Sequence, residues 1–344
     1  MHEILLIRDG GCERVVDTLA VAAELVLSLG TDTQVDIAVP ESCAEYVFMS
    51  SVVRRVIAVP AIDTEHGIEK TKKASIGSTL FSATKKLSAL TGRNVQAYWN
   101  MSKDLRITEY DAVFDFDFSP FSIAVSKVAK TKQIIGFDVQ NIDKTSKISY
   151  LSAHETYHIK GEMSNSSRMR HLAARHFSYS PATDGIPLDW CFNTYPAPEM
   201  IPQQPYIVVG GRVPAPFMTL VKESNLSVLV LEEQPTMRAE DITGALQSAK
   251  IAVGNGVVSA LAAAVGIPNL FIGSGKDIPQ RAISITTPSA LADALPLLVD
   301  EGATNNAENS DVATNAEINP DSAPPRTSDD NDPPPQVATL KLKK

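Results

Sequence analysis

The strongest constraint in this sequence is an alternation of short apolar runs with segments of helical spacing, present in both halves of the chain. Glu3–Ile7 is an apolar run of strand length, and Val15–Leu29 follows it with apolar residues every three or four positions. Gln34–Val39 is the next strand, and the pattern starts again at Tyr206–Val209. Repeated strand–helix–strand units predict parallel sheets with helices on both faces.

The length of 344 residues favours two domains of this kind. We expect a first α/β domain over 1–180, a proline-rich linker over 181–205 and a second α/β domain over 206–299. Further strands are predicted at 53–60, 110–116 and 133–137 and a helix at 164–177, whereas 65–109 looks less regular. Residues 300–344 are low in complexity and nearly free of aromatic side chains, which predicts a disordered tail.

Composition excludes several classes of function. The net charge of −9, part of which lies in the acidic tail, argues against nucleic-acid binding. Three scattered cysteines give neither a disulfide framework nor a structural zinc site, and they suit a reducing compartment. The apolar stretch 251–273 is interrupted by Asn255 and Pro268, so no transmembrane segment is expected. With no signal-peptide pattern at the N-terminus, we expect a cytoplasmic protein.

Candidate site residues follow from the sheet pattern. Ligands on parallel sheets lie beyond the carboxyl ends of the strands, which directs attention to the turn between Arg8 and Arg14 and to Asp115 and Asp117. Each of these acids has the alternative role of capping the next helix. His154 and His158 have the i, i+4 spacing of zinc ligands but lack an accompanying acid or a helical context, so no metal site is predicted.

Four stretches, taken in order, resemble the ADP-heptose–lipopolysaccharide heptosyltransferases. They are the opening strand, loop and helix that contains VVDTLAVAAEL, then EYDAVFDFDFSPFSIAVSKVAKTKQIIGFD at 109–138, SRMRHLAARHF at 167–177 and SAKIAVGNGVVSALAAAVGIPNLFIGSG at 248–275. The resemblance covers about 1–180 well and 206–280 in reduced form. It implies two Rossmann-like domains of the GT-B type that face a cleft, with the second domain shortened by about one strand–helix unit.

The resemblance also implies an activity, which is inverting transfer of a heptose or related sugar from a nucleotide sugar to a lipopolysaccharide inner-core acceptor without a metal or other cofactor. In that family a loop carboxylate takes the proton of the acceptor hydroxyl. In an ungapped match this position falls on Arg14, and arginine cannot act as a base near neutral pH. The nearby acids Glu13 and Asp9 are therefore the candidate catalytic bases, with a solvated loop as the alternative for each.

For the donor, the family's D-T-G-L-x-H motif falls on 255–260, where its Asp and His are both absent. What remains is a glycine turn before a helix, which can cradle a diphosphate on backbone N–H groups. The family's diphosphate lysine is missing too, so Arg212 and Lys276 are the candidates to replace its charge, with a surface role as the alternative for each. The predicted nucleotide-sugar residues are Gly254, Asn255, Gly256, Ser259, Gly210, Arg212 and Lys276.

For the acceptor, a run between Lys70 and Arg93 holds six basic residues and no acid. Such a cluster suits an anionic glycolipid at the inner membrane face, and a solvated lysine face is the alternative. The predicted acceptor-binding residues are Arg8, Lys70, Lys72, Lys73, Asp115 and Arg168. Because several family positions are altered, a second reading stays open, namely a catalytically inactive relative that binds a nucleotide sugar, a glycolipid or a partner enzyme.

Overall fold

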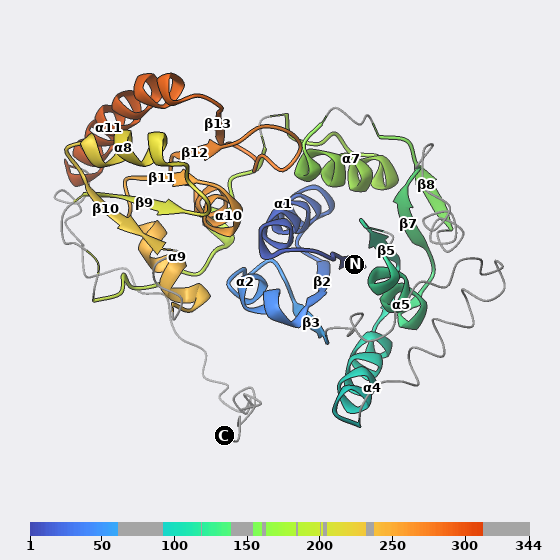
Figure 1. Cartoon of the computed structure of the whole chain (residues 1–344). Coiled ribbons are helices and arrows are strands. Elements are labelled where there is room, and N and C mark those ends of the chain that lie inside the picture. Colours follow the sequence, from blue (N-terminus) through green and yellow to red (C-terminus); the bar gives the residue numbers. More distant parts are fainter. Residues whose placement is uncertain are drawn as a thin grey trace, which may run out of the picture. The chain divides into compact units, whose positions relative to one another are not determined.

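The structure is a computed structural model of the chain, and it describes residues 1–60, 92–117, 119–138, 154–159, 163–183, 185–199, 201, 205–231 and 237–311. At 92–95, 120 and 300–311 the structure describes the backbone alone. The protein is an α/β protein with two parallel sheets, one built from the first half of the chain and one from the second (Figure 1).

The first sheet has six parallel strands in the order β3-β2-β1-β5-β7-β8. The chain enters at the centre of this sheet with β1 and moves outward to both edges, which places the ends of β1 and β5 side by side. The strands are β1 (His2–Ile7), β2 (Thr33–Pro40), β3 (Arg55–Val59), β5 (Ala112–Asp115), β7 (Ile134–Phe137) and β8 (Glu155–Tyr157).

Helices cover both faces of this sheet. Leu5, Ile7 and Val113 pack on one face with α4 (Gly92–Ile107) and α5 (Pro120–Val128), while Ile4 and Leu6 pack on the other with α1 (Cys12–Leu29), η1 (Glu41–Cys43), α2 (Ala44–Phe48) and α7 (Asn165–Phe177). A two-stranded pair, β4 (Glu109–Tyr110) with β6 (Lys130–Thr131), lies beside it. Because consecutive side chains of a strand point to opposite faces, these near-continuous apolar strands fill both layers.

The second sheet has five parallel strands in the order β10-β9-β11-β12-β13. The strands are β9 (Tyr206–Gly210), β10 (Ser227–Val230), β11 (Ile251–Gly254), β12 (Asn269–Ile272) and β13 (Ile283–Ile285). The helices are α8 (Ala215–Glu223), α9 (Ala239–Gln247), α10 (Gly256–Val265) and α11 (Pro288–Asp311). Helix α10 packs against α1, so a single apolar core continues from one sheet layer to the other.

The structure differs from the predicted elements in several places. The segment 65–109, expected to be irregular, contains α4 over Gly92–Ile107, and the predicted strand 110–116 is interrupted at Asp111. The short edge strands β8 and β13 were not predicted. Within the stretch expected to be a linker, η2 (Asp189–Cys191) forms and Ile186, Leu188 and Phe192 are buried.

Helix α11 runs to Asp311, and the rest of the low-complexity tail lies outside the described residues. Across the described ranges, no helix combines the length and apolar character needed to span a bilayer.

Candidate functional site

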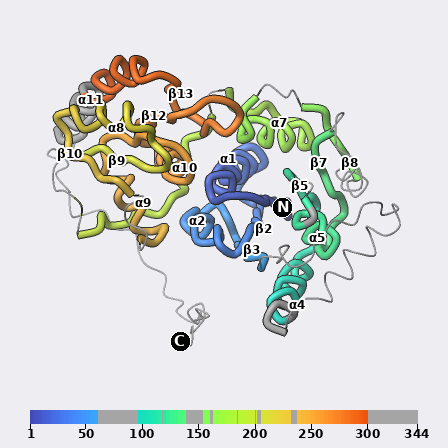
Figure 2. Tube along the Cα trace, in the orientation of Figure 1, coloured from blue at the N-terminus to red at the C-terminus, as the bar shows by residue number. Residues whose placement is uncertain are grey.

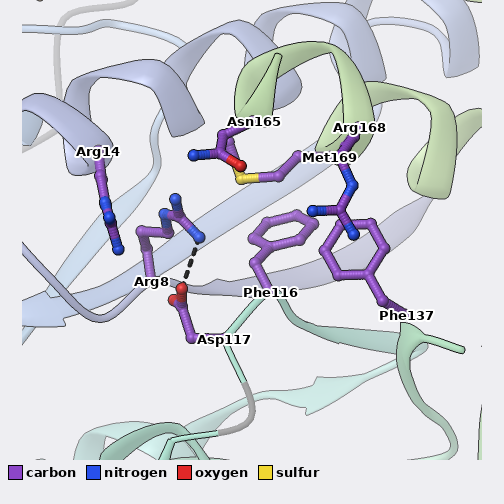
Figure 3. Close-up of a pocket in the computed structure, with 8 residues that line it drawn as sticks. All are labelled: Arg8, Arg14, Phe116, Asp117, Phe137, Asn165, Arg168 and Met169. Atoms are coloured by element: carbon purple, nitrogen blue, oxygen red, sulfur yellow. Dashed lines mark hydrogen bonds and ion pairs between the residues drawn. The ribbon is translucent and has the colours of Figure 1, made fainter. Parts of the chain in front are cut away.

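A cavity of about 240 Å³ lies at the carboxyl ends of β1, β5 and β7, against the first turn of α7 (Figure 3). Its lining joins four distant parts of the sequence: Arg8 and Arg14, Phe116 and Asp117, Phe137, and Asn165, Arg168 and Met169. Asn165, Arg168 and Met169 share one face of α7 because they are three and four residues apart. We refer to this cavity as the arginine pocket.

Arg8 and Asp117 form an ion pair at the base of the arginine pocket. The Arg8 Nη1 lies 2.6 Å from the Asp117 Oδ1, and both side chains are largely buried. The backbone N–H groups of Asp9 and Asp117 donate to the carboxylates of Asp117 and Asp115, at 2.7 and 3.1 Å. Burial raises the pKa of Asp117 above its ordinary value, although Arg8 and the Asp9 N–H act against this. Asp115, predicted as an acceptor residue, is fully buried and supports this turn.

Arg168 and Arg14 supply two further guanidinium groups. Arg168 stacks on the ring of Phe137, with 4.7 Å from the guanidinium carbon to the ring centre. Arg14 is exposed, and its Nη2 lies 3.9 Å from Asp277 Oδ1. Among the described residues, neither the Nε of Arg8 nor that of Arg168 has a hydrogen-bond partner, although both atoms are buried. Buried donors without partners are costly, so the arginine pocket is suited to an anionic ligand that accepts hydrogen bonds.

The two predicted bases do not line the arginine pocket. The carboxylate of Asp9 accepts from the N–H of Gly10 at 2.8 Å, and the carboxylate of Glu13 lies against Gly11. A third acid, Asp17, lies one turn beyond Arg14 on α1. Burial raises the pKa of Asp17 to about 7, with a further contribution from Asp277, while Arg8 opposes the shift.

In the second sheet, the ends of β9 and β11 meet at glycines. A Cβ on Gly254 would lie 1.8 Å from the carbonyl oxygen of Gly210, and a Cβ on Gly210 would lie 2.4 Å from Val258. Asn255 joins this turn to its neighbours, since its Oδ1 accepts from Arg212 N at 3.0 Å and its Nδ2 donates to Arg212 O at 3.2 Å. The predicted nucleotide residues Gly210, Arg212, Gly254 and Asn255 are therefore brought together.

Helix α10 begins at Gly256, which has open space beside it. In the described part of the chain, no side chain caps this helix start, and its first turn holds no acid. Its leading N–H groups thus favour an anion. The Ser259 hydroxyl points elsewhere, because it is buried and pairs with Asn269 at 3.1 Å.

The loop after β12 reaches the start of α7 (Figure 2). The backbone N–H of Asn165 donates to Lys276 O at 2.8 Å, and its side-chain amide donates to Asp277 Oδ1 at 2.7 Å. The side chain of Lys276 is exposed. This loop therefore connects a residue predicted for the donor with the helix that carries Arg168.

No family model and no curated protein sequence matches the chain. The E. coli heptosyltransferase WaaC, solved with ADP, is similar with a TM-score of 0.61 and 17% identity, over 87% of this chain and 99% of WaaC. The chain has the heptosyltransferase fold.

Two further solved structures are similar to this chain in fold. The E. coli ADP-heptose lipopolysaccharide heptosyltransferase II has a TM-score of 0.53 and 13% identity, over 90% of this chain and 99% of that one. A family 9 glycosyltransferase from Veillonella parvula has a TM-score of 0.57 and 7% identity, over 86% of this chain and 88% of that one.

Within this heptosyltransferase fold, Arg8 and Arg168, which were both predicted for the acceptor, line one pocket. Lys70, Lys72 and Lys73 lie outside the described residues. Sequence reasoning did not select Arg14, Phe116, Phe137, Asn165 or Met169, and it considered Asp117 without choosing it. His154 and His158 flank strand β8 instead of sharing a helix face, and among the described residues no cluster of three metal-ligating side chains occurs.

Proposed function

We propose that this protein is a glycosyltransferase that moves a heptose or related sugar from a nucleotide sugar to an anionic glycolipid acceptor of the lipopolysaccharide inner core. The observation that carries the proposal is the arginine pocket, whose two buried Nε donors have no hydrogen-bond partner in the described part of the chain. An acceptor phosphate or carboxylate supplies the missing hydrogen-bond acceptors and balances the excess of guanidinium groups over the Asp117 carboxylate. The heptosyltransferase fold supports the same activity.

The donor diphosphate fits best at the start of α10. Gly256 has open space beside it at the first turn of the helix, and a helix N-terminus stabilises negative charge. Arg212 and Lys276 are exposed cations on the two loops next to this turn. In this arrangement the departing nucleoside diphosphate gains charge where N–H groups and cations already lie, which favours its release.

Asp117 is the carboxylate best placed to act as base, since it lines the arginine pocket and burial raises its pKa. It would accept the proton of the acceptor hydroxyl while that oxygen attacks the anomeric carbon from the face opposite the leaving diphosphate. The new glycosidic bond forms as the sugar–phosphate bond breaks. Arg8 holds the carboxylate in place, and Asp9 and Glu13 are the alternative bases.

A second function is favoured by a specific observation. Arg14 occupies the loop position where the resemblance places an acid, and both oxygens of Asp117 already accept hydrogen bonds, from Arg8 and from Asp9 N. A protein built in this way can bind a nucleotide sugar or an anionic glycolipid without transferring the sugar.

Calorimetric titration with ADP and ADP-heptose, followed by an ADP-release assay with a purified inner-core acceptor, separates these functions. Transferase activity predicts binding and acceptor-dependent ADP release. Asp117→Asn should lower kcat by about 10²–10⁴-fold while donor binding is retained. Asp9→Asn and Glu13→Gln are matched controls, and the variant with the largest loss in kcat identifies the base. Binding without release supports the second function. Absence of ADP and ADP-heptose binding at millimolar concentration overturns both the transferase activity and the binding of a nucleotide sugar.

A further inference from the structure

Two of the three cysteines meet beside the loop that leads into the arginine pocket. Cys12 is the first residue of α1 and Cys43 is the last residue of η1. Their Sγ atoms lie 2.6 Å apart although they are 31 positions apart in the sequence. A disulfide joins sulfur atoms about 2.05 Å apart, so a shift of roughly 0.5 Å would bring the pair to bonding distance. Both residues carry free thiols in this structure.

The surroundings of the two sulfurs leave the pair free to react with each other. The nearest other partners are carbonyl and hydroxyl groups: Cys12 Sγ lies 3.8 Å from Ser42 O, and Cys43 Sγ lies 3.9 Å from Gly10 O and 3.8 Å from Ser42 Oγ. Cys12 is half-buried and reachable from solvent, whereas Cys43 is 2% exposed. The Cys12 sulfur is thus accessible to a small oxidant, and the Cys43 sulfur is buried next to it.

We propose that Cys12 and Cys43 form a redox modification site, closing an intramolecular disulfide when the protein meets a hydroperoxide. The Cys12 thiolate attacks one peroxide oxygen and releases hydroxide, which leaves a sulfenic acid on Cys12. The Cys43 sulfur then attacks the Cys12 sulfur, the S–S bond forms, and the sulfenic oxygen leaves as water. In total two thiols lose two electrons and two protons, and one hydrogen peroxide becomes two waters.

The surroundings of Cys12 affect the rate of this reaction. Burial, and then the neighbouring Cys43 thiol, raise the pKa of Cys12 well above its usual value. Since the thiolate is the reactive form, oxidation should be slow at neutral pH and should speed up as the pH rises. The pair is therefore a responder to sustained oxidation and not a fast peroxide sensor.

The position of the pair gives the disulfide a structural consequence. Gly10 and Arg14 lie on either side of Cys12, so the bond would tie the start of α1 to η1, which directly follows β2. Closing a loop between residues this far apart also restricts the unfolded chain, which raises thermal stability. The inference does not depend on the proposed transferase activity.

The test uses the full chain, treated with hydrogen peroxide, unfolded in denaturant and titrated for free thiols. The expected titre falls from three thiols to one, peptide mapping finds Cys12 joined to Cys43, and a reductant restores all three. Cys191 is the internal control, since its Sγ lies 3.1 Å from Leu188 O within the core. In thermal melts, oxidation should raise Tm in the native protein and leave Tm of Cys43→Ser unchanged.

Several outcomes would overturn the proposal. They are three thiols after prolonged oxidation at pH 8.5, a Cys12 sulfinic or sulfonic acid without the cross-link, or a disulfide that uses Cys191. Because mapping is done on the native sequence, the test stands even where a cysteine variant fails to fold.

Discussion

Arg170 of α7 and Glu24 of α1 form a two-pronged ion pair in the interior, with Nε to Oε2 at 2.8 Å and Nη2 to Oε1 at 3.1 Å. The two side chains are only 4% and 3% exposed. The backbone of Ala182 completes the arrangement, accepting from Arg170 at 2.5 Å and donating to Glu24 at 2.7 Å. One buried pair thus joins α1, α7 and the segment that leads to the second sheet.

Glu24→Gln should destabilise the protein strongly, because it leaves the Arg170 guanidinium buried beside a neutral group. The expected loss in the free energy of unfolding is about 3–5 kcal/mol, read from urea denaturation. The double variant Glu24→Leu with Arg170→Met removes both charges and should lose less stability than the sum of the losses in the single variants Glu24→Leu and Arg170→Met. If the loss in the double variant equals the sum of the two single losses, the pairing itself contributes little to stability.

The raised pKa of Asp17 predicts how the stability of the protein depends on pH. Its pKa is raised to about 7 in the folded protein, mainly by burial, against an ordinary value of 3.8. Between pH 4 and 7 the folded state therefore binds more protons at this site than the unfolded chain, and the Asp17 contribution to stability falls as the pH rises through this range. Asp17→Asn should raise the free energy of unfolding at pH 8 by roughly 2–4 kcal/mol and change it little at pH 4.

The measurement is urea denaturation of both proteins at pH 4, 6 and 8. Asp117 has a pKa shift of the same direction and leaves a residual slope in both proteins, so the difference between them isolates Asp17. A variant that is less stable than the native protein at pH 8 would contradict the assignment.

Much of the fold was predictable from the sequence because parallel strands buried on both faces are apolar throughout. β1 and β9 are of this kind and were predicted nearly to the residue. The helix α4 was missed because its sequence is polar on average and only residues such as Met101 and Leu105 face the sheet. The edge strands β8 and β13 have three residues each, too few for a periodic signal.

The candidate site was predictable in position but not in detail. The rule that ligands lie beyond strand ends pointed to Arg8 and to the acids at the end of β5. It did not distinguish Asp115, which is buried in the strand, from Asp117, which enters the arginine pocket. The aromatic lining by Phe116 and Phe137 depends on β5 and β7 being neighbours, which is a tertiary relationship that no local pattern in one sequence carries.

The glycines at the second sheet give the last prediction. Gly254 has φ of +145°, and a Cβ there would lie 1.8 Å from the backbone oxygen of Gly210, so Gly254→Ala meets both strain and a backbone clash. Gly256 has φ of +66° and nothing within 4 Å of its Cβ position, so Gly256→Ala should cost only the left-handed strain, about 1–2 kcal/mol. Gly254→Ala should cost more, about 3 kcal/mol or above, because backbone atoms cannot move aside as a side chain can.

Urea denaturation of the two variants compares their losses in the free energy of unfolding directly. Equal losses would mean that the β9 and β11 ends separate easily, and a diphosphate cradle built on their close approach would then lose its rigid support.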